Sequence, residues 1–223
     1  MIRKTTTLDE LLRALNAAAE PAYKADMNHF GSRPAHALGV RIPAIRALAK
    51  GLRDHDLAAE LWATGIHEAR ILACFVDDPK KITREQMDAW AAAFDSWDVC
   101  DQACGSLFVF SPHALDCIHS WCADEREYVR RAGFALIASG AWKWKDAPDE
   151  VFRPFLALTR KYARDDRNFV KKAVNWALRQ IGKRNPALRE EAIQTAKVIL
   201  MDGTRAGKWV AQDALRELQH TER

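Results

Sequence analysis

The sequence has no apolar run that approaches the roughly 20 residues a helix needs to cross a bilayer, although 48% of its 223 residues are hydrophobic. Its first ten residues also lack the apolar core of a signal peptide. Because both features of a membrane or exported protein are missing, we expect a cytoplasmic protein with no membrane partner.

Common motifs for cofactors and catalytic metals are missing as well. The chain contains no Walker A loop, no glycine-rich dinucleotide fingerprint and no His-Glu-x-x-His motif. It also lacks the Gly-x-Ser-x-Gly nucleophile elbow and the zinc deaminase signature. The sequence therefore predicts no cofactor and no bound metal.

The cysteines are odd in number and form no Cys-x-x-Cys pair, which indicates reduced thiols. Two His–Cys pairs at helical spacing, 113/117 and 119/122, are compatible with a metal site. Free cysteines are nevertheless among the most buried residue types, so a place in the core explains them more simply.

Positive charge is concentrated in the second half of the chain. Residues 125–223 contain 21 Lys and Arg against 13 Asp and Glu, a net charge of +8, whereas residues 1–124 contain 13 against 17, a net charge of −4. Residues 167–184 contain six Lys or Arg and no Asp or Glu, so we expect that salt bridges on the helix surface do not account for this segment. The distribution fits a nucleic-acid partner, and a solvated charged surface is the alternative.

Helical periodicity dominates nearly every segment, and few segments alternate like strands. Thr7 with Glu10 fits a capping box, and Ser111 and Asn185 each precede a proline, as helix-capping residues do. Connections are short, which favours an all-α chain with one domain over residues 1–223. The predicted helices span about 7–18, 21–29, 43–53, 55–64, 66–77, 84–94, 97–109, 112–122, 125–139, 149–164, 167–183, 186–201 and 204–219.

The later helices repeat an aromatic–Val start at Tyr128, Phe169 and Trp209, 41 and then 40 residues apart. This period is close to the roughly 40–47 residues of HEAT and armadillo repeats. A further amphipathic helix precedes each of the three. We therefore expect a right-handed or otherwise curved solenoid of HEAT-like antiparallel helix pairs, with one helix of each pair lining a concave basic cleft.

Helical geometry predicts which side chains share that cleft. We take Trp97 and the aromatic residues that open the next two inner helices as equivalent positions. At 100° per residue, Trp97, Asp101, Arg131 and Trp176 then fall within one arc of about 100°. Two tryptophans, a carboxylate and an arginine are expected to line one cleft.

Two carboxylates lie near one another in this region, an arrangement used in glycoside hydrolysis. Asp98 falls in the first turn of its helix, where a carboxylate interacts favourably with the helix dipole. Asp101 falls further along the same helix, beside aromatic residues. We favour the dipole role for Asp98, whereas for Asp101 the dipole explanation is weaker.

Four motifs occur in order along the chain. They are Gly39-Val40-Arg41-Ile42-Pro43 with Arg46, Trp97-Asp98-x-x-Asp101, Tyr128-Val129-Arg130-Arg131, and Phe169-Val170-Lys171-Lys172-Ala173-x-x-Trp176-x-Leu178-Arg179. With them the chain resembles, over nearly its whole length, the HEAT-like DNA alkylation-repair glycosylases of the AlkD type. The resemblance implies removal of N3- and N7-alkylated purines from duplex DNA without a metal or cofactor.

The resemblance also implies roles for individual residues. Asp101 matches the catalytic carboxylate, Trp97 and Trp176 match the two cleft tryptophans, and Arg131 matches an arginine that contacts DNA; the adjacent Arg130 leaves that arginine's register open by one position. Ser96 departs from the pattern, since familiar members can carry a second Trp there, and Gly133 lies in mid-helix. The residues expected to bind the DNA backbone are Arg130, Lys171, Lys172, Arg179 and Lys208.

The sequence thus predicts a monomeric, monofunctional alkylpurine DNA glycosylase that acts on double-stranded DNA containing alkylated bases. One alternative is a non-catalytic DNA-binding solenoid that recognises damaged or branched DNA. Another is a protein-binding HEAT scaffold, which is expected to bind DNA weakly and only at low salt.

Overall fold

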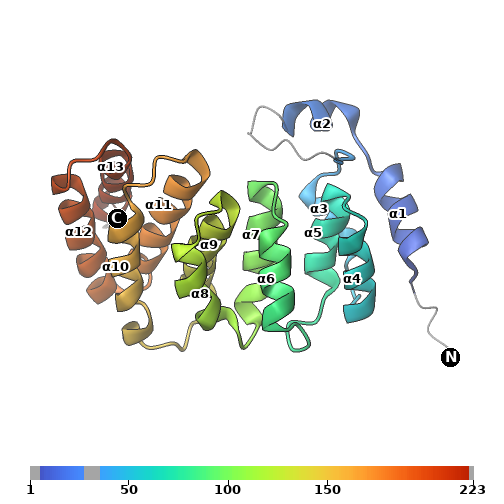
Figure 1. Cartoon of the computed structure of the whole chain (residues 1–223), viewed down its shortest axis with the longest axis horizontal. Helices are drawn as coiled ribbons and strands as arrows, with labels where there is room; N and C mark the ends of the chain where they lie inside the picture. Colours follow the sequence, from blue (N-terminus) through green and yellow to red (C-terminus); the bar gives the residue numbers. More distant parts are fainter. Residues whose placement is uncertain (1–5, 28–35, 221–223) are drawn as a thin grey trace.

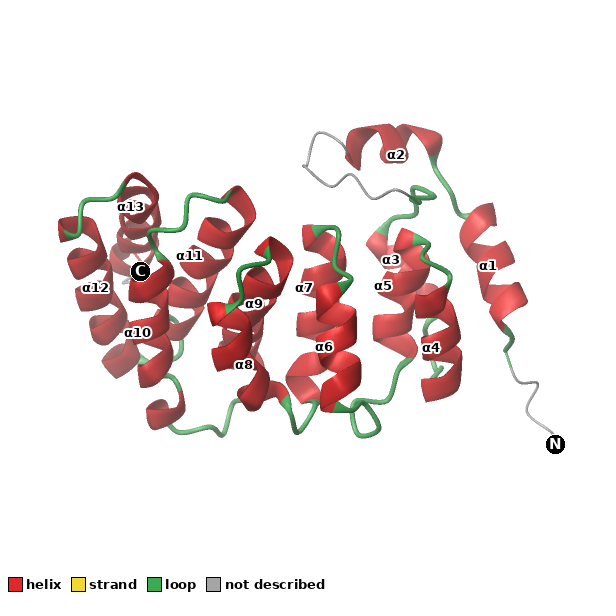
Figure 2. Cartoon of the chain, viewed as in Figure 1, coloured by secondary structure: helices red, strands yellow, loops and turns green. Residues whose placement is uncertain are grey.

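A computed structural model describes residues 6–27 and 36–220, and the regular structure within these ranges is entirely helical (Figures 1 and 2). This confirms the predicted all-α fold. No helix in the same ranges is both long and apolar enough to cross a membrane. The elements are α1 (Leu8–Ala17), α2 (Pro21–Met27), α3 (Ile42–Leu48), α4 (His55–Ala63), α5 (His67–Val76), α6 (Arg84–Ala92), α7 (Trp97–Ser106), the 3-10 helix η1 (Phe108–Phe110), α8 (Ala114–Ala123), α9 (Glu127–Lys143), the 3-10 helix η2 (Asp149–Val151), α10 (Arg153–Tyr162), α11 (Asn168–Gly182), α12 (Pro186–Met201) and α13 (Arg205–His220).

The helices form a stack of pairs along the long axis of the molecule. Helices α5, α7, α9, α11 and α13 each contact the next in this series, and they make one layer. Helices α4, α8, α10 and α12 each pack against the helix that follows them. Figure 1 shows the stack running from α1 at one end to α12 and α13 at the other. The predicted solenoid of helix pairs is confirmed.

The repeated aromatic–Val dipeptides mark the seam between successive inner helices. Val129, Val170 and Val210 are at most 2% exposed and belong to one hydrophobic cluster that extends from α1 to α13. The rings of Tyr128 and Phe169 lie 5.6 Å apart between α9 and α11. The 40-residue period therefore records equivalent packing positions. That one domain covers all of residues 1–223 stays a prediction.

Two of the predicted helix starts are confirmed and one is wrong. The Thr7 hydroxyl accepts the Glu10 N–H while the Glu10 carboxylate accepts the Thr7 N–H, and the Asn185 side chain accepts the N–H of Leu188. Ser111 does not begin a helix, because its hydroxyl accepts the N–H of His113 and α8 starts at Ala114.

Four predicted helices differ from the observed ones by more than two residues. The helix predicted over 97–109 ends at Ser106, and η1 follows it. The helix predicted to reach residue 53 ends at Leu48, and Gly51, with φ +78°, turns the chain. The one predicted over 149–164 is divided into η2 and α10, and Pro154 lies in the first turn of α10, where its missing N–H costs no helical bond. Helix α9 continues past residue 139 to Lys143, which adds Trp142 to it. Of the predicted 21–29 helix, residues 28 and 29 lie outside the described residues.

The five cysteines are all buried side chains of the core. Cys117 and Cys122 are 0% exposed and pack within the hydrophobic cluster. The interpretation of the cysteines as core residues is confirmed.

Asp165 is a carboxylate of the C-terminal half that pairs with two arginines. It lies between α10 and α11 and accepts hydrogen bonds from Arg130 Nη1 and Arg167 Nη2, both at 2.6 Å. Burial acts to raise its pKa, but the hydrogen bonds from Arg167 and Arg130 lower it to about 2. A carboxyl whose pKa is lowered in the folded state stabilises that state when it is ionised.

We therefore expect Asp165→Asn to reduce the free energy of unfolding by on the order of 2 kcal/mol at neutral pH. Because the stabilisation is present above the unfolded-state pKa of Asp, the gap between wild type and variant should close as the pH falls from about 4 to about 2. Urea unfolding over a pH series measures this difference in the free energy of unfolding, with the exposed Asp146→Asn as control. A gap that does not narrow in acid would contradict this role.

Candidate functional site

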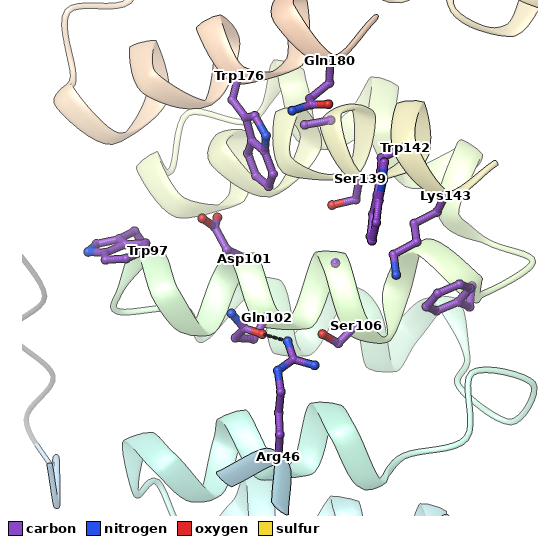
Figure 3. A pocket seen from close by; sticks show the side chains of 13 residues that line it. Arg46, Trp97, Asp101, Gln102, Ser106, Ser139, Trp142, Lys143, Trp176 and Gln180 are labelled. Atoms are coloured by element: carbon purple, nitrogen blue, oxygen red, sulfur yellow. Dashed lines mark hydrogen bonds between the residues drawn. The ribbon is translucent and has the colours of Figure 1, made fainter. Parts of the chain in front are cut away.

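A cavity of about 780 Å³ lies between α7, α9 and α11, with Arg46 of α3 at its edge (Figure 3). Its volume falls in the range of small-molecule sites. Trp97, Asp101 and Trp176 line it, so the structure brings together three of the four predicted cleft residues. Figure 3 shows Asp101 between the two tryptophans.

The carboxylate of Asp101 is held by a bidentate ion pair. Arg131 Nε donates to Oδ1 at 2.9 Å and Arg131 Nη2 donates to Oδ2 at 2.7 Å. The remaining terminal nitrogen of Arg131 donates to the Phe169 carbonyl at 2.7 Å. The pair thus connects α7, α9 and α11, and paired geometry of this kind fixes orientation as well as charge.

Burial raises the pKa of Asp101 above its ordinary value, and the neighbouring Arg131 guanidinium acts in the opposite direction. The same pairing overcomes the effect of burial on Arg131, whose pKa is raised. Asp101 keeps 17% of its side chain exposed, whereas Arg131 keeps 7%. The carboxylate therefore presents an edge to the cavity from a site where water screens its charge poorly.

Arg131 is placed differently from the prediction that it lines the cleft and contacts DNA. Its guanidinium lies behind Asp101, outside the lining of the cavity, and 5.9 Å from the centre of the Trp97 ring. The helical arc located the correct side of α9 but ignored the neighbouring helix, which covers that position. Its contacts make Arg131 a positioning residue for Asp101.

The two tryptophans come from different repeats. Trp97 is the first residue of α7, and Trp176 lies in the middle of α11. Both are half-buried, so part of each ring is accessible from the cavity. Flat aromatic faces beside a carboxylate suit a planar group that carries positive charge.

Asp98 faces away from this cavity and toward α5. Its carboxylate lies 2.9 Å from Nε2 of His67, a side chain only 2% exposed. Asp98 lies in the first turn of α7 as predicted. Sequence reasoning missed its partner because the two residues are 31 positions apart.

The N-terminal motif is organised by the buried carboxylate of Glu68. It accepts the N–H groups of Leu38, Gly39 and Val40 at 2.8, 2.7 and 3.2 Å. Gly39 has φ +91°, a conformation that favours glycine. This turn leads into α3, from which Arg46 reaches the cavity and donates to Gln102 Oε1 at 2.8 Å.

Three of the predicted backbone-binding cations are available at the surface. Lys172 and Lys208 are exposed. Lys171 is half-buried, and its ammonium lies 5.5 Å from the centre of the Trp209 ring. These groups belong to α11 and α13 at the C-terminal end of the stack.

The other two predicted cations are engaged within the protein. Arg130 pairs with Asp165 at 2.6 Å, and Arg179 pairs with Asp213 and Glu217 of α13. The expectation that salt bridges do not account for residues 167–184 is therefore wrong. Arg167 also pairs with Asp165, and Lys183 also pairs with Glu217. The acidic partners of Arg179 and Lys183 belong to the adjacent helix, which the local sequence does not show.

Sequence reasoning missed the far end of the cavity. Ser139, Trp142 and Lys143 of α9 and Gln180 of α11 line it there (Figure 3). Trp142 and Lys143 were overlooked because the helix was predicted to end at residue 139. The signal that was present is Trp142 itself, an aromatic residue one helical turn after a position facing the cleft.

A family model, a curated relative and a solved structure match most of the chain. Residues 11–218 match the model of a family described as DNA alkylation repair enzyme. A curated relative, the uncharacterized protein Lin0241 of Listeria innocua serovar 6a, is 22% identical over 198 residues, which cover 86% of each chain. A solved structure has a TM-score of 0.75 at 22% identity and covers 86% of this chain and 83% of that one. It is described as representing a new family related to the HEAT-like repeat DNA glycosylases, with affinity for branched DNA structures.

Proposed function

Because the chain belongs to the family of DNA alkylation repair enzymes, we propose that it excises N3- and N7-alkylated purines from duplex DNA. One observation carries the proposal. The carboxylate of Asp101 is fixed by Arg131 and presented to a cavity between the faces of Trp97 and Trp176. Three smaller cavities lined by described residues do not combine these groups.

The reaction needs few catalytic groups because the alkylated purine is already positively charged. When the bond from C1′ to the purine nitrogen breaks, its electron pair leaves with the base, and no general acid is required. Positive charge then develops on the deoxyribose. The fixed carboxylate of Asp101 stabilises that charge, and a water that it orients adds to C1′ and gives its proton to solvent.

The tryptophans and the surface lysines hold the substrate. The faces of Trp97 and Trp176 attract the cationic base and sugar, each contributing about 0.5–2 kcal/mol. The exposed Lys172 and Lys208 bind phosphates, which positions the DNA without reading its sequence. The proposed enzyme acts as a monomer in the cytoplasm and uses no metal or cofactor.

Alkylpurine release tests the function directly. Duplex DNA treated with a methylating agent is incubated with the protein, and released methylpurines are separated by chromatography and quantified. We expect release above the protein-free rate. The product strand should contain abasic sites without nicks, because the mechanism uses no lysine nucleophile. Nicking that accompanies release would contradict the monofunctional mechanism.

The second candidate is a non-catalytic protein that binds damaged or branched DNA. The description of the solved structure, which attributes such affinity to that protein, is the observation that favours it. This candidate predicts tight DNA binding with no methylpurine release. The glycosylase proposal predicts DNA binding together with methylpurine release.

A further inference from the structure

The cavity has a second end that the proposed chemistry does not use. Trp142 and Phe110 line this end and are 58% and 50% exposed, unlike most large apolar side chains of the described residues. Figure 3 shows Trp142 projecting from α9 beside Ser139 and Lys143. Large aromatic side chains left open in a binding cavity indicate that something planar packs there.

Positive charge accompanies these rings. The Lys143 ammonium lies 4.2 Å from the centre of the Trp142 ring and 5.2 Å from that of Phe110. Lys145 places a second ammonium 6.0 Å from the Trp142 ring. An exposed aromatic ring with neighbouring cations is the combination that single-stranded nucleic-acid sites use, the ring for the base and the cations for the phosphates.

The backbone that carries Trp142 is tied down although its ring is exposed. Arg184 Nη1 donates to the carbonyls of Ala141 and Trp144, at 2.8 and 3.1 Å. The Trp144 indole donates to the Val109 carbonyl at 2.8 Å. The end of α9 is therefore anchored to two other parts of the chain, so the backbone that carries Trp142 needs no ordering when a base binds.

We propose that Trp142, with Lys143 and Lys145, forms a stacking subsite for one unpaired nucleobase next to the nucleotide held at Asp101. The inference rests on the proposed DNA substrate. It specifies which duplexes bind best, namely those with a base displaced beside the lesion. Both ends belong to one cavity. Base–aromatic stacking is stronger than an exposed cation–π contact, so Lys143 leaves the ring for a phosphate when a base arrives.

The test compares two duplexes of the same sequence and length, one fully paired and one with a single bulged nucleotide. Wild type should bind the bulged duplex more tightly. Trp142→Ala should weaken binding to the bulged duplex by about 5- to 150-fold, the range expected for base–aromatic stacking, with little change for the paired duplex. Trp142→Phe, which keeps a ring, should restore most of the preference.

A fluorescent base reports on stacking itself. With 2-aminopurine as the bulged base, wild type should quench the fluorescence on binding and Trp142→Ala should not. Trp209→Ala is the matched control, since Trp209 is another exposed tryptophan near a lysine but lies outside this cavity. The same quenching by wild type and Trp142→Ala, or an equal loss of affinity for both duplexes, would overturn the proposal. These readouts need no catalysis, so absence of methylpurine release would refute the proposed function and leave this test intact.

Discussion

Asp101→Asn is expected to lower the rate of methylpurine release by about 100- to 1,000-fold, the loss typical when one preorganised electrostatic group is removed. Asparagine keeps the size of the side chain and one oxygen that can accept from Arg131. It removes the negative charge that faces the developing positive charge of the sugar. The measurement is single-turnover release from methylated duplex, with DNA affinity determined in parallel.

Asp98→Asn is the matched control for this variant. Asp98 lies on the same helix, three residues earlier, but its carboxylate faces His67 and not the cavity. We expect no comparable loss of release from it. Equal release by wild type and Asp101→Asn would remove the carboxylate from the mechanism, and an equal loss in both variants would show that only the stability of α7 matters.

Arg131→Met is expected to reduce the free energy of unfolding by about 3–5 kcal/mol, because it leaves a largely buried carboxylate without its counter-charge. The substitution also removes the hydrogen bond to the Phe169 carbonyl, which ties α9 to α11. Urea unfolding at neutral pH measures the effect. The exposed Arg205→Met serves as control and should change stability by no more than about 0.5 kcal/mol.

The double variant Arg131→Met/Asp101→Asn separates the charge pair from simple packing. Once residue 101 is neutral, the loss of Arg131 no longer leaves a buried charge unpaired. The double variant should therefore lose less free energy of unfolding than the sum of the two single losses. Additive losses would show that the pair contributes packing alone. That result would contradict the role assigned to Arg131 as the group that holds the carboxylate.

Features that depend on residues within one helix were predicted well from the sequence. The capping residues Thr7 and Asn185 make the contacts that their types suggest, and the 40-residue repeat identifies equivalent positions along the stack. Ser111 failed as a cap because the same hydroxyl also stabilises a turn, and local sequence does not decide between the two.

The candidate site was predicted only in part, because spacing along the chain gives the face of a helix but not the partners across a helix interface. Trp97, Asp101 and Trp176 were found because a shared angular position on parallel inner helices suffices to bring them to one cavity. Arg131 shares that arc, yet it turns to Asp101 across the helix interface. Trp142 was missed because the helix was predicted to end at residue 139. Its last turn is held by Arg184, which donates to the Ala141 carbonyl and lies 42 residues after Trp142 in the chain.

By itself the sequence determined the helices, the repeat that stacks them and the face on which the acid and the two tryptophans lie. Each of these follows from spacing along the chain, 3.6 residues for a helical face and 40–41 for a repeat. Only the tertiary structure decided which charges stay exposed and which face one another. The deciding partners, such as Asp101 with Arg131 and Glu217 with Arg179, are 30 and 38 residues apart, and oppositely charged groups pair wherever packing brings them within reach.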